Sequence, residues 1–229
     1  MRTSIKISFL LCLLTNLCMA QNTWDKMLKL YSTAETYAMD ISVSMDMTGD
    51  QDMVTYKGCV KQSGANYYSS MQGVTTMYGP KYWVIAYENQ KTLYYGKSNP
   101  DVQKGMVNGQ KDFADSLLKL TTKPILKSTG NDEEVYAYQM KDGIYKTVEY
   151  TIQVSTGYLT KVVYAYRTSP DVSYDQVTII YSAISVNQPI DNSWFSEKNY
   201  FSLKNGKGTG AGKFAGYTTV DQDAAIPTR

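Results

Sequence analysis

The chain has 229 residues with 23 basic and 21 acidic side chains, three cysteines and no histidine. A formal net charge of +2 provides no basic surface for nucleic acid, so we expect no nucleic-acid partner. Without histidine the chain cannot form a Ser-His-Asp or Cys-His catalytic site and lacks the commonest zinc ligand. We therefore expect a protein that is not an enzyme and needs no metal or cofactor, with a histidine-free hydrolase that uses carboxylates as the remaining enzymatic alternative.

The first twenty residues have the features of a secretory signal peptide. Arg2 and Lys6 precede an apolar run over 7–14, and Ala20 supplies the small residue preferred before the cleavage site. The run is shorter than the roughly 20 residues that span a bilayer. We expect residues 1–20 to be removed on export to the periplasm and no transmembrane segment to remain.

The cysteines predict a mature chain without an internal disulfide. Cys12 and Cys18 lie in the signal peptide, so only Cys59 survives processing. A lipid anchor on Cys18 is the weaker alternative, because bulky Leu17 stands where a small residue is expected. Cys59 has no base nearby in sequence and is interpreted as a small, partly buried side chain.

The mature chain begins with a predicted helix. Trp24, Met27, Leu28 and Tyr31 follow the spacing i, i+3, i+4 and i+7, which indicates an amphipathic helix over 23–36.

The next stretch, residues 37–47, alternates apolar and polar side chains as a half-buried strand does. After a turn at 49–52, a second strand over 54–60 completes a hairpin. Its apolar face is rich in methionine, whose three rotatable bonds suit variable apolar partners. Either these methionines line a cavity for acyl chains, or they fill an irregular core.

Further strands follow at short intervals and indicate an antiparallel meander. A helix is expected over 111–121, ended by Pro124. The predicted strands are 66–72, 74–78, 81–88, 91–96, 133–140, 145–155, 158–167 and 174–187. These elements predict a mainly β protein with helices (α+β), in which a strongly curved, unclosed antiparallel β-barrel carries helices over its concave face.

The carboxyl-terminal region is rich in glycine. The run "GKGTGAGK" fits no phosphate-binding fingerprint and is interpreted as a flexible linker. We treat residues 204–229 as a glycine-rich extension with a candidate edge strand at 213–220. Acidic side chains near Asp46 and Asp50 do not fit the calcium-loop pattern and are interpreted as solvated turns.

Several stretches together resemble the LolA/LolB-like lipoprotein-carrier superfamily. They are "YKGCVKQSGANYY", "KYWVIAYENQKTLYYG", "EYTIQVSTGYLTKVVYAY" and "VTIIYSAISVNQPIDNSWFS", in an order that follows the leading helix and long strand. The resemblance runs over about residues 23–203, so residues 21–203 are assigned to a LolA-like lipid-carrier domain. The chain departs from the family at Gln62, where the best studied carriers have an arginine that helps to hold the lid.

The resemblance implies a periplasmic carrier or chaperone that binds acyl chains of lipoproteins or other lipids and moves them towards the outer membrane. It implies inner- and outer-membrane transport partners, and we expect a monomer. The alternative is a non-enzymatic cell-envelope sensor or ligand-binding module of the same fold, for lipid or glycan. The expected cavity lining is Met39, Ile41, Val43, Met45, Trp83, Ile85, Tyr150 and Ile152, covered by Phe113 and Leu117.

Overall fold

The computed structural model describes residues 23–49, 52–99, 123–168 and 173–223. In these residues it contains one α-helix over 23–32, three short 3₁₀ helices and fourteen strands. The strands are β1 (Thr36–Met47), β2 (Val54–Ser63), β3 (Asn66–Met71), β4 (Val74–Tyr78), β5 (Tyr82–Tyr87), β6 (Thr92–Lys97), β7 (Ile125–Thr129), β8 (Glu133–Gln139), β9 (Tyr145–Gln153), β10 (Leu159–Tyr166), β11 (Tyr174–Val186), β12 (Phe201–Lys204), β13 (Lys207–Gly210) and β14 (Thr218–Asp221).

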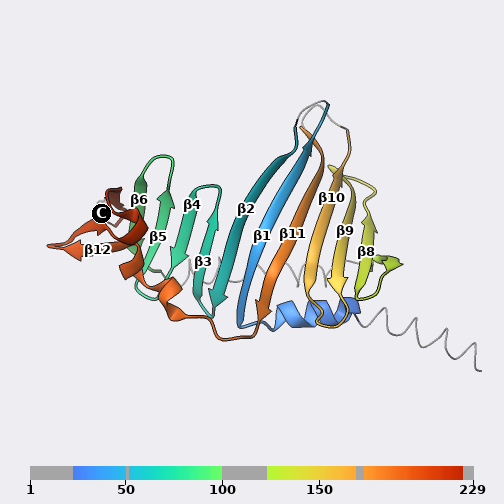
Figure 1. Cartoon of the computed structure of the whole chain (residues 1–229), viewed down its shortest axis with the longest axis horizontal. Coiled ribbons are helices and arrows are strands. Elements are labelled where there is room, and N and C mark those ends of the chain that lie inside the picture. Colours follow the sequence, from blue (N-terminus) through green and yellow to red (C-terminus); the bar gives the residue numbers. More distant parts are fainter. Residues whose placement is uncertain (1–22, 50–51, 100–122, 169–172, 224–229) are drawn as a thin grey trace, which may run out of the picture. The chain divides into compact units, whose positions relative to one another are not determined.

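Twelve strands form one sheet in the order β14-β6-β5-β4-β3-β2-β1-β11-β10-β9-β8-β7, and β12 pairs with β13 (Figure 1). In the described residues the two ends of this order, β14 and β7, are not joined, so the sheet is unclosed as predicted. β14 lies parallel to β6, whereas every other pair with a recorded register is antiparallel. The predicted helix over 111–121 falls outside the described residues, and helices over a concave face remain a prediction.

The chain divides into two compact units. Unit 1 takes the described parts of 1–33, 43–55 and 113–181, and unit 2 takes those of 34–42, 56–112 and 182–229. Each unit has a core that can be described by itself.

The core of unit 1 forms where the helix lies across the lower ends of β10, β9 and β8 in Figure 1. The Trp24 ring centroid lies 5.4 Å from that of Tyr136 and 5.4 Å from that of Tyr150. The Leu159 amide donates a hydrogen bond to the Tyr31 hydroxyl at 3.3 Å. Trp24, Met27, Leu28 and Tyr31 are all buried, so the predicted apolar stripe is the face that packs on the sheet.

The helix ends four residues earlier than predicted. The Thr33 hydroxyl donates to the Lys29 carbonyl at 2.8 Å, and the Ser32 hydroxyl donates to the same carbonyl at 3.1 Å. Such side-chain hydrogen bonds offer the last turn an alternative to further helical bonds. β1 then begins at Thr36.

The core of unit 2 lies between its meander and the C-terminal segment, which we define as residues 189–223. Alternate side chains of the strands point to this segment and are buried, among them Met77, Val84 and Leu93. From the segment Phe195, Tyr200, Phe201 and Phe214 pack against them. We call this side of the meander the covered face and the opposite side the Trp83 face.

The glycine-rich run is not a linker, which corrects the sequence interpretation. Residues 207–210 form β13 and pair with β12, from Phe201↔Gly210 to Lys204↔Lys207. Asn205 and Gly206 connect the strands with φ values of 52° and 75°, the conformation required by a two-residue hairpin turn. The Gly208 amide donates to the Tyr95 hydroxyl at 3.0 Å, which fixes the hairpin on the covered face.

Two edge strands also differ from the expectation. The candidate edge strand at 213–220 is shorter, because 212–214 form a 3₁₀ helix and only Thr218–Asp221 pair with β6. β7 was not predicted, because four of its five side chains are exposed and no apolar alternation marks it.

Candidate ligand-binding site

The predicted lining residues occupy different environments. On β1 Met39 is buried, whereas Ile41, Val43 and Met45 are half-buried. On β5 Trp83 and Ile85 are half-buried, and on β9 Tyr150 and Ile152 are buried. Phe113 and Leu117 lie outside the described residues.

Trp83 and Ile85 lie together in an open pocket of about 450 Å³ on the Trp83 face of unit 2. The pocket is completed by Tyr87, Gln90, Tyr94 and Gln222. Its side chains carry no formal charge, and most of its wall is aromatic or aliphatic. Such a lining favours the apolar part of a ligand, with two amide groups available for a polar part.

Strand pairing explains why these side chains meet. Trp83, Ile85 and Tyr87 are two residues apart on β5 and therefore share a face. Ile85 stands opposite Tyr94 in the register, and the rings of Tyr87 and Tyr94 meet edge to face at 5.9 Å. The sequence could have identified Tyr87 as a lining residue, because it is spaced two residues from Ile85 on the same strand. Gln222 could not be identified, because it reaches the pocket through the pairing of β14 with β6, which was not predicted.

A glycine makes room for the indole of Trp83. Gly96 stands directly opposite Trp83 in the register. A Cβ atom added at Gly96 would lie 2.8 Å from Trp83 Nε1 and 2.9 Å from Cε2, closer than such atoms can approach. The Tyr78 ring stacks on the other side, with centroids 6.5 Å apart, so the indole is held flat beside β6.

Tyr150 and Ile152 are buried side chains of β9. They belong to unit 1, where Tyr150 contacts the Trp24 ring beneath the helix. Ile152 is fully buried at 0% exposure in the same core. These two side chains therefore contribute to the packing of unit 1.

Burial raises the pKa of several tyrosine hydroxyls of unit 1. Desolvation raises the pKa of Tyr31 to about 12, although the hydrogen bond from Leu159 opposes it. Desolvation also raises the pKa of Tyr181 to about 12, and the nearby Tyr164 adds to the shift. These hydroxyls are neutral at physiological pH and act only as hydrogen-bonding groups.

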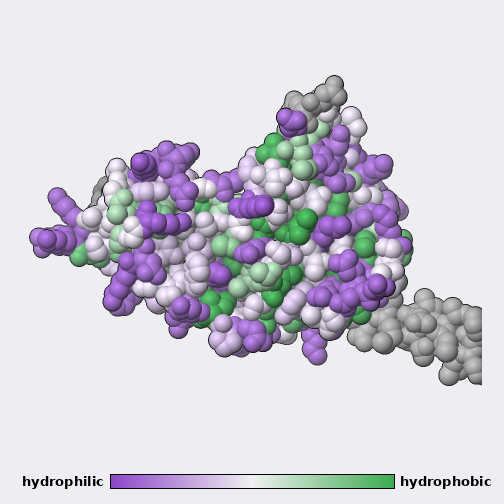
Figure 2. All heavy atoms as spheres, viewed as in Figure 1, coloured by the Kyte–Doolittle hydropathy of each residue, from purple (hydrophilic) through white to green (hydrophobic). Residues whose placement is uncertain are grey.

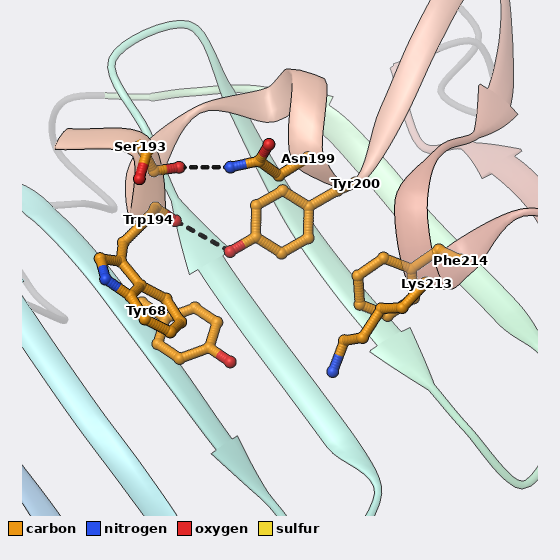
Figure 3. Close-up of a pocket in the computed structure, with 7 residues that line it drawn as sticks. All are labelled: Tyr68, Ser193, Trp194, Asn199, Tyr200, Lys213 and Phe214. Carbon is orange, nitrogen blue, oxygen red and sulfur yellow. Dashed lines mark hydrogen bonds between the residues drawn. The ribbon is translucent and has the colours of Figure 1, made fainter. Parts of the chain in front are cut away.

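A second pocket of about 260 Å³ lies on the covered face of unit 2 (Figure 3). It is bounded by Tyr68 of β3 and by residues of the C-terminal segment, including Trp194, Asn199 and Lys213. In Figure 3 the Tyr200 hydroxyl points to the Trp194 carbonyl, and this hydrogen bond measures 2.8 Å. No functional role was expected for these side chains from the sequence.

Few large apolar side chains are exposed in the part of the chain that the structure describes. On the face shown in Figure 2, hydrophobic residues lie in small patches between hydrophilic ones. Trp194 is 39% exposed, and Ile180 is 45% exposed. The helix of the described residues is too short to cross a membrane.

Cys59 lies half-buried on the covered face, as interpreted from the sequence. Desolvation raises the pKa of its thiol, while the ammonium groups of Lys61 and Lys213 oppose that shift. A raised pKa lowers the thiolate fraction, so the side chain is poorly suited to nucleophilic chemistry. In the described residues no group of three His, Cys, Asp or Glu side chains could hold a metal ion.

Neither a family model nor a curated protein sequence matches the chain. Among solved structures, an uncharacterized conserved protein from Thermus thermophilus is 7% identical, covering 89% of this chain and 99% of that one at a TM-score of 0.44. A LolA superfamily protein from Nitrosomonas europaea is 10% identical to this chain. The match covers 78% of this chain and 98% of that protein, with a TM-score of 0.31. A chain of the Pseudomonas aeruginosa MucA/MucB complex is also 10% identical. The match covers 77% of this chain and 60% of that one, with a TM-score of 0.39.

A LolA superfamily protein is thus among the solved structures to which this chain is similar, in line with the resemblance stated from the sequence. Identities near 10% and TM-scores below 0.5 carry no argument about what this chain binds.

Proposed function

We propose that the protein is a periplasmic carrier or chaperone that binds acyl chains of a lipoprotein or another lipid and moves them towards the outer membrane. The observation that carries the proposal is the uncharged, aromatic-lined pocket around Trp83 and Ile85. The proposal includes no catalytic step, and it includes partners at both membranes that load and unload the cargo.

The dimensions of the pocket suit a stretch of hydrocarbon chain. From Trp83 to Tyr87 the strand advances four residues, or roughly 13 Å at about 3.3 Å per residue. Each methylene group transferred from water to this wall contributes about 0.8 kcal/mol to binding. Five methylene groups would supply roughly 4 kcal/mol, which is enough to hold a chain reversibly.

The methionine face of β1 is a separate part of the proposal, because Met45 lies in unit 1 and does not line the Trp83 pocket. Met45 lies on β1 with part of its side chain exposed, while Met39 is 5% exposed and packs as core. A thioether with three rotatable bonds can follow chains of different length or branching.

The position of Gln62 bears on the cargo. Gln62 is 5% exposed, and its amide donates to the Gly64 carbonyl at 3.3 Å across the β2–β3 turn. This amide supports the turn locally and supplies no charge. We propose that the cargo is retained by the apolar wall alone, without an arginine latch.

Displacement of a fluorescent fatty acid tests the proposal. The wild type is expected to bind the probe, and Ile85→Asp is expected to weaken binding at least tenfold because it puts a charge into the apolar wall. Ile180→Asp is the matched control, since Ile180 is 45% exposed on β11 and lies outside the pocket. Met45→Asp tests the methionine face separately.

Equal binding by the wild type and Ile85→Asp would contradict this placement of the site. Native mass spectrometry of the purified protein supplies an independent measurement, in which co-purified acyl chains support a carrier. A protein that is free of lipid and silent to the probe would favour the alternative, a non-enzymatic envelope sensor or binding module.

A further inference from the structure

The pocket on the covered face is small and has both aromatic and polar walls. Its volume of about 260 Å³ corresponds to roughly nine water molecules at about 30 Å³ each. Tyr68, Trp194, Tyr200 and Phe214 supply aromatic walls, and Ser193, Asn199 and Lys213 supply polar groups (Figure 3). It shares no lining residue with the Trp83 pocket.

The exposed indole of Trp194 is held rigidly. Asp191 caps the 3₁₀ helix Asn192–Phe195, and its carboxylate accepts from the Ser193 amide at 2.8 Å. The Tyr200 hydroxyl donates to the Trp194 carbonyl at 2.8 Å, and the Tyr68 ring supports the indole at 4.9 Å. A large apolar ring that is fixed in place and still 39% exposed is a typical anchor for a ligand.

The polar groups around the indole include both donors and acceptors. The Asn199 amide nitrogen donates to the Ser193 carbonyl at 2.6 Å, which orients its carbonyl oxygen as an acceptor. The Lys61 ammonium lies 4.5 Å from the centre of the Trp194 ring, on a flexible stem that can move aside and still donate. The Lys213 ammonium is a second donor, at 3.5 Å from the Glu88 carboxylate.

The charges around the pocket balance. The ammonium groups of Lys61 and Lys213 are positive, whereas the carboxylates of Glu88 beside Lys213 and of Asp191 beside Ser193 are negative. A site for a strong anion or cation would carry an excess of the opposite sign. A pocket with both hydrogen-bond donors and acceptors but no net charge instead suits a ligand with hydroxyl groups. Each hydroxyl group can donate and accept a hydrogen bond.

We infer that this pocket binds one sugar unit of an uncharged glycan, with its C–H face against the Trp194 ring and its hydroxyls on Ser193, Asn199 and the two lysines. A pyranose ring combines an apolar face with a rim of hydroxyls, so it satisfies both kinds of wall. The protein would then hold a glycan through its C-terminal segment, independently of any acyl chain on the Trp83 face.

Saturation-transfer NMR on the full mature chain tests the inference. The panel consists of neutral oligosaccharides of glucose, galactose, mannose and N-acetylglucosamine, with uronic acid oligosaccharides of equal length. We expect at least one neutral series to bind. Trp194→Ala should weaken it about tenfold, which corresponds to roughly 1.4 kcal/mol.

Two further variants keep the result interpretable. Trp194→Phe retains an aromatic ring and should retain most of the binding, which excludes misfolding as the cause of the loss. Leu203→Ala removes another exposed apolar side chain of the same segment, outside the pocket, and should bind as the wild type does. The inference is overturned if no neutral series binds, if Trp194→Ala binds normally, or if the uronic acids bind more tightly.

Discussion

The shape of the Trp83 pocket depends on the absence of a side chain at Gly96. The indole occupies the space above Gly96, so the pocket depends on one absent side chain as much as on the aromatic rings. The sequence marks Trp83 and Ile85 as members of one strand face, because period-two spacing is local. It does not mark Gly96 as their neighbour, because that contact depends on the register of β5 and β6.

Gly96→Ala should therefore reduce binding of the fatty-acid probe by about tenfold, since the added methyl would displace the indole. Fluorescence titration measures the effect. Gly130→Ala is the matched control, because its Cβ would meet only Glu133 at 3.6 Å, an ordinary contact. Probe affinity that does not respond to Gly96→Ala would show that the indole position is irrelevant to binding.

Because the tyrosines of unit 1 are buried, we expect the free energy of unfolding to fall at alkaline pH. The folded-state pKa of Tyr31 is about 12, whereas an unfolded tyrosine has its ordinary value of 10.0. Between these values the unfolded state releases a proton that the folded state retains, so the free energy of unfolding falls as the pH rises. Below pH 10 the stabilisation is fully present.

Guanidinium unfolding at a series of pH values from 8 to 12 measures this fall. Tyr31→Phe removes one titrating group and should make the decline shallower, even though it also removes the acceptor for the Leu159 amide. Tyr56→Phe serves as the comparison, because Tyr56 is only half-buried on β2. An identical decline in Tyr31→Phe and the wild type would assign the alkaline loss to other groups.

At the scale of elements, the local sequence pattern was sufficient to predict the strands of the meander. It was not sufficient to predict the C-terminal hairpin that packs on them. The helix stripe and the alternation of β1 to β6 are periodic within a few residues and were predicted correctly. The hairpin β12–β13 was missed although Asn205-Gly206 is a strong turn signal. The many glycines around it masked the alternation, because glycine has no side chain that shows which face it occupies.

One glycine of that hairpin has a clear structural requirement. A Cβ added at Gly208 would lie 2.5 Å from Tyr95 Cε1 and 2.8 Å from its hydroxyl. Gly208→Ala should lower the free energy of unfolding by about 1–3 kcal/mol, the usual cost of overpacking. Urea unfolding measures it.

Combining Gly208→Ala with Tyr95→Ala tests the cause. If contact with the ring is responsible, the alanine should cost much less where the ring is already absent. Additive losses in the double variant would place the cost elsewhere in the hairpin.

At the scale of the molecule, each described unit has a separate segment that packs over its strands. Unit 1 buries the apolar face of the N-terminal helix, and unit 2 buries aromatic side chains of the C-terminal segment. From the sequence, residues up to 203 were assigned to the LolA-like domain and only residues 204–229 to an extension. This part was unpredictable from local pattern because its partners on β3 to β6 lie about a hundred residues earlier. Phe195, Phe201 and Phe214 show no period that would reveal a common role.

A chain ended after Gln188 should expose the covered face of unit 2. We expect a lower midpoint of thermal unfolding and increased fluorescence of an apolar dye, because Val84 and Leu93 would lose their cover. A chain ended after Asp223 is the control. Equal midpoints and equal dye fluorescence for the two chains would show that the segment contributes little to the core.

The parallel pairing of β14 with β6 has a consequence for biogenesis. The two strands are separated by more than a hundred positions, so β14 leaves the ribosome long after β6. Until residues 189–223 have been made, the meander would carry an uncovered apolar surface, which is a natural target for holding chaperones. The covered face would thus be completed only when this C-terminal segment has been made.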